Sequence, residues 1–201
     1  MYRISSHLLW IVMTATIYLS CFLPSRAHAV QYMGLKEAIK YFLPQGSKVS
    51  KVDKTIPKDK LKVIEERFRL RSTDDFKETL PAGPYTFYIG RDASGKASIY
   101  IVILEQYWRT CYHKYAIGIE PSGKIKEVIV VELNCRFAYP INRKSFLKQF
   151  AKKSAAPGKR VPVEVGHDVD AISGASVSSE VTAIVTRRAL ALYELFFASA
   201  S

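Results

Sequence analysis

The amino-acid sequence predicts one α+β domain, in which helices pack against an antiparallel sheet. Apolar and β-branched runs separated by short polar turns occupy residues 85–133, a pattern typical of hairpins. An apolar pattern with helical spacing follows residue 176. Strands and helices that are segregated along the chain are typical of the α+β class. With 201 residues, 48% of them hydrophobic, the chain is long enough to bury a core of its own.

Residues 1–29 have the pattern of an export signal. Arg3 lies in a short polar start, residues 8–23 are apolar, and Ala27-His28-Ala29 has the form of a cleavage site. The apolar run is shorter than the roughly 20 residues of a membrane-spanning helix, although an uncleaved anchor is the alternative. We expect an exported protein, located in the periplasm or at the outer face of the cytoplasmic membrane.

The chain after residue 29 is basic. Its net charge is +10, because Arg3 and Arg26 lie in the signal and the whole chain carries +12. A basic surface favours an anionic partner, such as a phosphorylated cofactor, an acidic redox protein or an anionic membrane face, and it equally favours simple solubility. Nucleic acid is not expected as a partner, because the basic residues are not interleaved with aromatic ones.

Residues 30–105 predict an N-terminal layer of helices and strands. The strand nearest its end is apolar on both faces, which predicts a central place in the sheet. The expected elements are a helix over 35–43, a strand over 47–53, a helix that begins at Pro57, and strands over 85–90 and 98–105.

A second hairpin is expected over residues 112–120 and 125–133. If Ile119 faces Glu127 in it, then Cys111 faces Cys135 at a distance that permits a disulfide. An exported protein allows this bond, whereas a one-residue change of register would leave two separate buried thiols. Neither cysteine belongs to a CxxC or CxxCH motif, so no zinc site or attached haem is expected.

Residues 106–201 complete the predicted domain. A helix is expected over 141–152, a loop over 155–159, a short extended piece over 161–165 and a long closing helix after residue 176. Small and hydroxylated residues fill the stretch Asp168–Ser179 before and at the start of that helix. A helix start offers free N–H groups and a partial positive charge, so this stretch could hold a phosphate.

Three interpretations of Ser176 compete. A serine hydrolase is disfavoured, because the last glycine of a G-x-S-x-G elbow is absent and no histidine follows Ser176. A structural turn is the second interpretation, with the hydroxyl of Ser176 or Ser178 capping the closing helix. The third is covalent attachment of a phosphorylated cofactor to the Ser176 hydroxyl.

Residues 170–176, Asp-Ala-Ile-Ser-Gly-Ala-Ser, support the third interpretation. They resemble the D-x-x-[S/T]-G-A-[S/T] flavinylation motif of the FMN-binding domain family. That family includes the C subunit of the sodium-pumping NADH:quinone reductase, the G subunit of the Rnf complex and small exported flavoproteins. The resemblance implies that an FAD-dependent flavin transferase attaches FMN to Ser176 through its phosphate.

The resemblance covers more than the motif. Residues 115–119, 122–125 and 128–132 are similar to the family's central hairpin, and residues 146–150 to its F-x-x-Q-F helix. Two features depart from the family pattern. The acceptor is serine where threonine is commoner, and residues 134–140 lack the usual Gly- and Glu-rich loop and carry Cys135, Arg136 and Tyr139.

The resemblance and the helix-start argument together assign roles around Ser176. Backbone N–H groups of Val177 and Ser178 would bind the phosphodiester. The small residues Gly174 and Ala175 would let the cofactor approach the backbone closely, and Ser173 would donate a hydrogen bond to its phosphate. Asp170 would brace the loop or help the transferase bind its metal. The candidates for lining the flavin ring are His113, Tyr115, Glu132, Arg136 and Tyr139, each of which has sheet packing or a surface position as its alternative.

The expected function is that of an exported electron carrier with FMN linked to Ser176, without a substrate-turnover site of its own. Its expected partners are the flavin transferase and redox donor and acceptor proteins, membrane-bound ones included. Two alternatives stay open: a module that binds flavin or another anionic ligand without a covalent bond, and a flavin subunit of a multi-protein reductase.

Overall fold

The structure is a computed structural model that describes residues 30–70, 80–135, 137–155, 161 and 163–198. The predicted signal over residues 1–29 and the candidate Arg136 lie outside the described residues. Within the described ranges, no helix is both long and apolar enough to span a bilayer.

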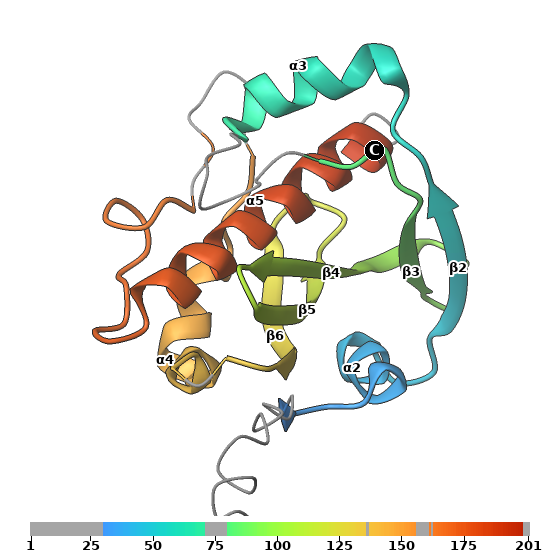
Figure 1. The fold of residues 1–201 in the computed structure, drawn as a ribbon. Coiled ribbons are helices and arrows are strands. Elements are labelled where there is room, and N and C mark those ends of the chain that lie inside the picture. The colour runs from blue at the N-terminus through green and yellow to red at the C-terminus, as the bar shows by residue number, and fades with distance from the viewer. Residues whose placement is uncertain (1–29, 71–79, 136, 156–160, 162, 199–201) are drawn as a thin grey trace, which may run out of the picture.

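One six-stranded antiparallel sheet organises the domain (Figure 1). Its strand order is β1-β6-β5-β4-β3-β2, so the two long hairpins occupy the middle and N-terminal strands form the edges. The predicted α+β class with an antiparallel sheet is confirmed. The strands are β1 (Val30–Gln31), β2 (Lys48–Lys54), β3 (Tyr85–Arg91), β4 (Ala97–Trp108), β5 (Cys111–Ile119) and β6 (Ile125–Leu133).

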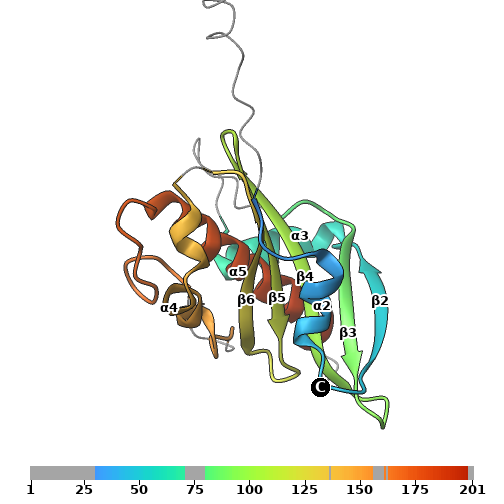
Figure 2. The same ribbon diagram turned by 90° about the horizontal axis from the view of Figure 1, so that it is seen from below.

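Helices cover both faces of the sheet (Figure 2). The long helix α5 (Ser176–Phe197) crosses one face, and α3 (Lys58–Phe68) packs against α5 on its outer side (Figure 1). The short helix α2 (Leu35–Phe42) lies on the opposite face. The domain therefore has two hydrophobic cores separated by the sheet.

Strand β4 contributes to both cores, because its side chains alternate between the faces. Val102 and Leu104 belong to the core beneath α5, whereas Ile99 and Ile101 belong to the core beneath α2. The prediction of a central strand that is apolar on both faces is confirmed.

Helix α2 packs very closely on β5. A Cβ atom added at Gly118 would come within 2.4 Å of the Phe42 ring, which is itself buried. Only a residue without a side chain leaves room for this ring.

The prediction of one helix over residues 141–152 is wrong. The chain instead makes a 3₁₀ turn η1 (Tyr139–Asn142), a single α-helical turn α4 (Lys144–Leu147) and a second 3₁₀ turn η2 (Lys148–Phe150). Arg143 is extended, with φ −69° and ψ 130°, and this interrupts the helix. The apolar side chains that predicted the helix, those of Phe146, Leu147 and Phe150, are buried as expected.

The predicted register of the β5–β6 hairpin is wrong near its turn and correct at its open end. Ile119 pairs with Ile125 rather than with Glu127. Two register shifts, at Gly118/Ile119 and at Lys114/Tyr115, then move the pairing so that His113 faces Leu133. Continued by two residues, that pairing sets Cys111 opposite Cys135.

Candidate functional site

The start of α5 is left without a side-chain cap. Its N-cap residue is Ala175, and the first helical hydrogen bond runs from the Ser179 N–H to the Ala175 carbonyl, at 2.9 Å. The interpretation of Ser176 or Ser178 as the cap is therefore wrong, because both lie inside the first turn. The N–H groups of residues 176–178 have no acceptor within the helix, so they are available to an anion.

Ser179 fastens the preceding turn to this helix. Its Oγ accepts a hydrogen bond from the Ile172 N–H at 3.1 Å and donates one to the Ala175 carbonyl at 3.0 Å. Gly174 lies within the turn at φ +77°, a conformation that disfavours residues with a side chain. The turn therefore keeps a fixed shape. The sequence motif gave no role to Ser179, although a hydroxyl within the first helical turn is a typical local hydrogen-bonding signal.

Gln149 braces the other end of the motif. Its Oε1 accepts from the Asp170 N–H at 2.8 Å, and its Nε2 donates to the Asp170 carbonyl at 3.3 Å. Lys153 donates to the Asp168 carbonyl at 2.8 Å. Segment 144–153 therefore holds the backbone of the loop through Gln149 and Lys153. Asp170 itself is exposed.

A cavity of about 620 Å³ opens beside the helix start, within the size range of small-molecule sites. Ser176 is exposed in its wall, and the surface of the wall is mostly apolar. The other residues of the wall come from the motif, from the tip of the β4–β5 hairpin and from the segment after β6; they are Gly174, Ala175, Val177, Ser178, Trp108, Thr110, Cys111, Asn134, Cys135 and Phe137.

Six residues of the wall were not among the predicted site residues: Trp108, Thr110, Cys111, Asn134, Cys135 and Phe137. The β4–β5 hairpin extends well beyond the neighbouring strands (Figure 2). At the tip of this hairpin, Trp108 pairs with Cys111 across a two-residue turn, in which Arg109 has φ 52°. Phe137 is 70% exposed. This exposure and the place of the ring near the motif loop are tertiary features, so no local sequence pattern indicates this wall.

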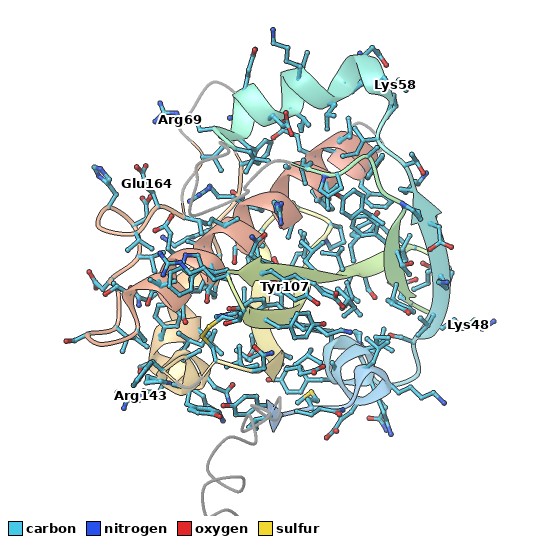
Figure 3. All side chains as sticks on the ribbon, in the orientation of Figure 1. Lys48, Lys58, Arg69, Tyr107, Arg143 and Glu164 are labelled. Atoms are coloured by element: carbon cyan, nitrogen blue, oxygen red, sulfur yellow. A yellow bond between two sulfur atoms is a disulfide. The ribbon has the colours of Figure 1, made fainter. Side chains whose placement is uncertain are left out.

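A disulfide forms part of the same wall. Cys111 and Cys135 are joined, with their Cα atoms 4.9 Å apart, which confirms the predicted pairing (yellow bond in Figure 3). The strands also hold together beside it: the Asn134 N–H donates to the Tyr112 carbonyl at 3.1 Å, and the Tyr112 N–H donates to Asn134 Oδ1 at 2.6 Å.

His113 and Tyr115, two candidates for lining the ring, are fully buried beneath α5 and lie outside the cavity wall. Thr182 Oγ1 donates to the Ser178 carbonyl at 2.8 Å and accepts from the Tyr115 hydroxyl at 2.8 Å. The Tyr115 hydroxyl in turn accepts from Nδ1 of His113 at 3.1 Å. This chain of hydrogen bonds links the sheet to the first turn of α5.

The bonding pattern fixes the protonation of His113. Its Nδ1 carries the hydrogen, and its Nε2 has no hydrogen-bond partner among the described residues. Burial lowers the pKa of His113 to about 4, so the ring is neutral at neutral pH. Burial also raises the pKa of Tyr115, which stays protonated.

The remaining candidates lie apart from the cavity wall. Glu132 faces Lys114 in the sheet, and Lys114 makes an ion pair with Glu105 at 2.9 Å. Tyr139 begins η1, and Ser173 is exposed in the motif loop. Within the described ranges, no three His, Cys, Asp or Glu side chains are arranged to hold a metal ion.

The fold is similar to that of one solved protein structure. The crystal structure of NqrC from Shewanella oneidensis superposes with a TM-score of 0.52 at 18% sequence identity, over 94% of this chain and 100% of that one. The chain therefore has an NqrC-like fold. No family model and no curated protein matches its sequence.

Proposed function

We propose that this protein is an exported flavoprotein that carries FMN on Ser176 and passes electrons between redox partners. One observation carries the proposal: in an NqrC-like fold, the D-A-I-S-G-A-S motif places an exposed serine hydroxyl at an uncapped helix start beside an apolar cavity.

The helix start suits the phosphate end of FMN. A phosphodiester keeps one negative charge, and the N–H groups of residues 176–178 together with the helix dipole stabilise such a charge. The N-cap side chain does not compete for these groups, because Ala175 makes no capping hydrogen bond. The uncapped start would be costly in a purely structural turn, and an attached phosphate removes that cost.

The cavity suits the ring end of FMN. Its mostly apolar wall would exclude water, and Trp108 and Phe137 provide aromatic surfaces for a flat ring. FMN supplies reversible one- and two-electron transfer when bound, while the protein orients it and tunes its electronics. The residues of this chain therefore fit the cofactor at both ends.

The exposed part of the motif suits recognition by a flavin transferase. Asp170, Ser173, Gly174 and Ser176 are all exposed, so a second protein can reach them. Gln149 already braces the loop through the Asp170 backbone, which leaves the Asp170 carboxylate for the transferase. We assign Asp170 to the attachment step rather than to holding the attached cofactor.

The partners follow from the same proposal. An exported flavin carrier needs a redox donor and a redox acceptor, either as separate proteins or as subunits of one membrane-associated complex. The net charge of +10 after the predicted signal favours partners with acidic faces.

Intact mass tests the attachment. Co-expression with a flavin transferase should raise the mass by one FMN phosphoester, about 438 Da. Ser176→Ala should abolish the gain, whereas Ser122→Ala, which changes an exposed serine on a distant turn, should keep it. A gain that persists in Ser176→Ala would refute the assignment. A yellow colour lost on denaturation would favour the non-covalent alternative.

A further inference from the structure

The disulfide and the proposed attachment serine border one cavity, although they come from different elements. Cys111 begins β5, Cys135 follows β6, and Ser176 begins α5. All three line the same space of about 620 Å³. A cofactor tethered at Ser176 and lying in this cavity would share it with the S–S bond.

We propose that the Cys111–Cys135 disulfide is redox-active and exchanges two electrons with the flavin, a proposal that rests on FMN being carried on Ser176. In the reducing direction, dihydroflavin gives up two electrons and two protons and returns to oxidised FMN. The S–S bond breaks, and each sulfur takes one electron and one proton to become a thiol. The reverse reaction restores the disulfide and reduces FMN.

The exposure of the two cysteines favours exchange through the cavity. Cys135 is only 9% exposed and Cys111 is half-buried, yet both contribute to the cavity wall. Thiol–disulfide reactions depend on access to the sulfur atoms. The S–S bond is therefore shielded from bulky external reductants, whereas a group bound in the cavity can contact it directly.

The surrounding hydrogen bonds allow the bond to open without loss of the fold. Tyr112 and Asn134, the neighbours of the two cysteines, are joined by two hydrogen bonds, and His113 pairs with Leu133 one residue further along. The two chains therefore stay together when the S–S bond breaks. The thiols remain opposite each other, ready to close again.

Light-driven reduction tests the exchange, because EDTA and light reduce a protein through its own flavin. The full-length exported protein is first shown by mass to carry FMN, then illuminated anaerobically with EDTA and quenched in acid. Alkylation under denaturing conditions and peptide mass then report the thiols at Cys111 and Cys135. Two alkylated cysteines per chain are expected after illumination and none in the dark.

The Ser176→Ala protein with an equal concentration of free FMN is the matched control. Thiols should appear in it at least about tenfold more slowly, because the tether supplies a millimolar effective concentration. Equal rates would overturn exchange through the attached flavin. A fully bleached flavin with both cysteines still joined would overturn the proposal outright.

Electron counting gives an independent readout. Stepwise anaerobic reduction of the loaded protein should take up four electrons per chain, two for FMN and two for the disulfide. The Cys111→Ser/Cys135→Ser protein should take up two. Uptake of two electrons by the unsubstituted protein would contradict the proposal. Failure of the underlying FMN assignment is distinguishable, because the loaded mass would then be absent at the first step.

Discussion

The hydroxyl of Tyr115 donates to Thr182 Oγ1 at 2.8 Å and thereby ties the centre of the sheet to the first turns of the helix that begins at Ser176. Thr182 Oγ1 in turn donates a hydrogen bond to the Ser178 carbonyl, and Nδ1 of His113 donates one to the Tyr115 hydroxyl. The position of the cavity wall formed by residues 176–178 therefore depends on groups that do not line the cavity.

Removing the Tyr115 hydroxyl should destabilise the protein. Tyr115→Phe leaves the Nδ1–H of His113 without an acceptor in a buried place, so the free energy of unfolding should fall by about 1–3 kcal/mol. Urea unfolding with the disulfide intact measures the change. Tyr107→Phe removes a hydroxyl from a largely exposed residue (labelled in Figure 3) and should change stability by less than about 0.5 kcal/mol. Equal effects of the two substitutions would contradict a buried network.

The buried His113 should make stability depend on pH in acid. Its pKa is about 4 in the folded protein and near 6.5 in the unfolded chain. The unfolded chain therefore binds a proton first as the pH falls, and stability should decrease between about pH 6.5 and 4 and then level off for this group. The full loss is on the order of 3 kcal/mol.

Comparison with His113→Gln isolates this contribution, because the carboxylates titrate in both proteins. The difference between their unfolding free energies should change across the window from pH 6.5 to 4. A constant difference between His113→Gln and the unsubstituted protein would show that His113 does not titrate as expected.

Gln149 should govern how well the motif loop is presented for flavin attachment. Gln149→Met keeps the approximate volume but removes both hydrogen bonds to the Asp170 backbone, at about 1 kcal/mol each. The loaded fraction after a fixed co-expression time, measured by intact mass, should fall. Lys148→Met alters the exposed neighbour and should leave loading unchanged. Identical loading in the two variants would argue against a positioning role.

The close packing of α2 on the sheet should be sensitive to one methyl group. Gly118→Ala places a Cβ within 2.4 Å of the Phe42 ring, and the overpacking should cost about 1–3 kcal/mol. Phe42→Leu in the Gly118→Ala background should recover part of that loss, because the smaller side chain leaves room. Thermal unfolding of the four proteins of this double-mutant cycle checks the coupling. Strict additivity would contradict the contact.

The sequence predicted the sheet well because its strands are long and strongly patterned. Strand β6 has the predicted bounds, residues 125–133, and β4 lies in the middle of the sheet as its two apolar faces indicate. The register of the β5–β6 pair was predicted less well, because no residue pattern indicates the two shifts between these strands. The predicted disulfide is nevertheless correct, because both shifts lie between the turn and the cysteines. Each shift moves the pairing by one residue, so beyond them the register again sets Cys111 opposite Cys135.

The candidate site was predicted only where it is local in sequence. Residues 174–178 form one wall of the cavity as one continuous stretch. Trp108 reaches the same cavity because the β4–β5 hairpin is long, and Phe137 reaches it because of the path that the chain takes after β6. Both are tertiary features. His113 and Tyr115 were candidates for lining the ring, but their strand positions direct them into the core beneath α5.

The dual use of α5 has a consequence for the order of events in maturation. The helix that presents the Ser176 hydroxyl also supplies much of the core on one face of the sheet, through residues such as Val181, Val185 and Leu192. The hydroxyl, the turn fastened by Ser179 and the cavity wall come together only when this helix has docked. A transferase that recognises the assembled loop would therefore modify only chains that have finished folding. The covalent cofactor would then be present only on folded protein.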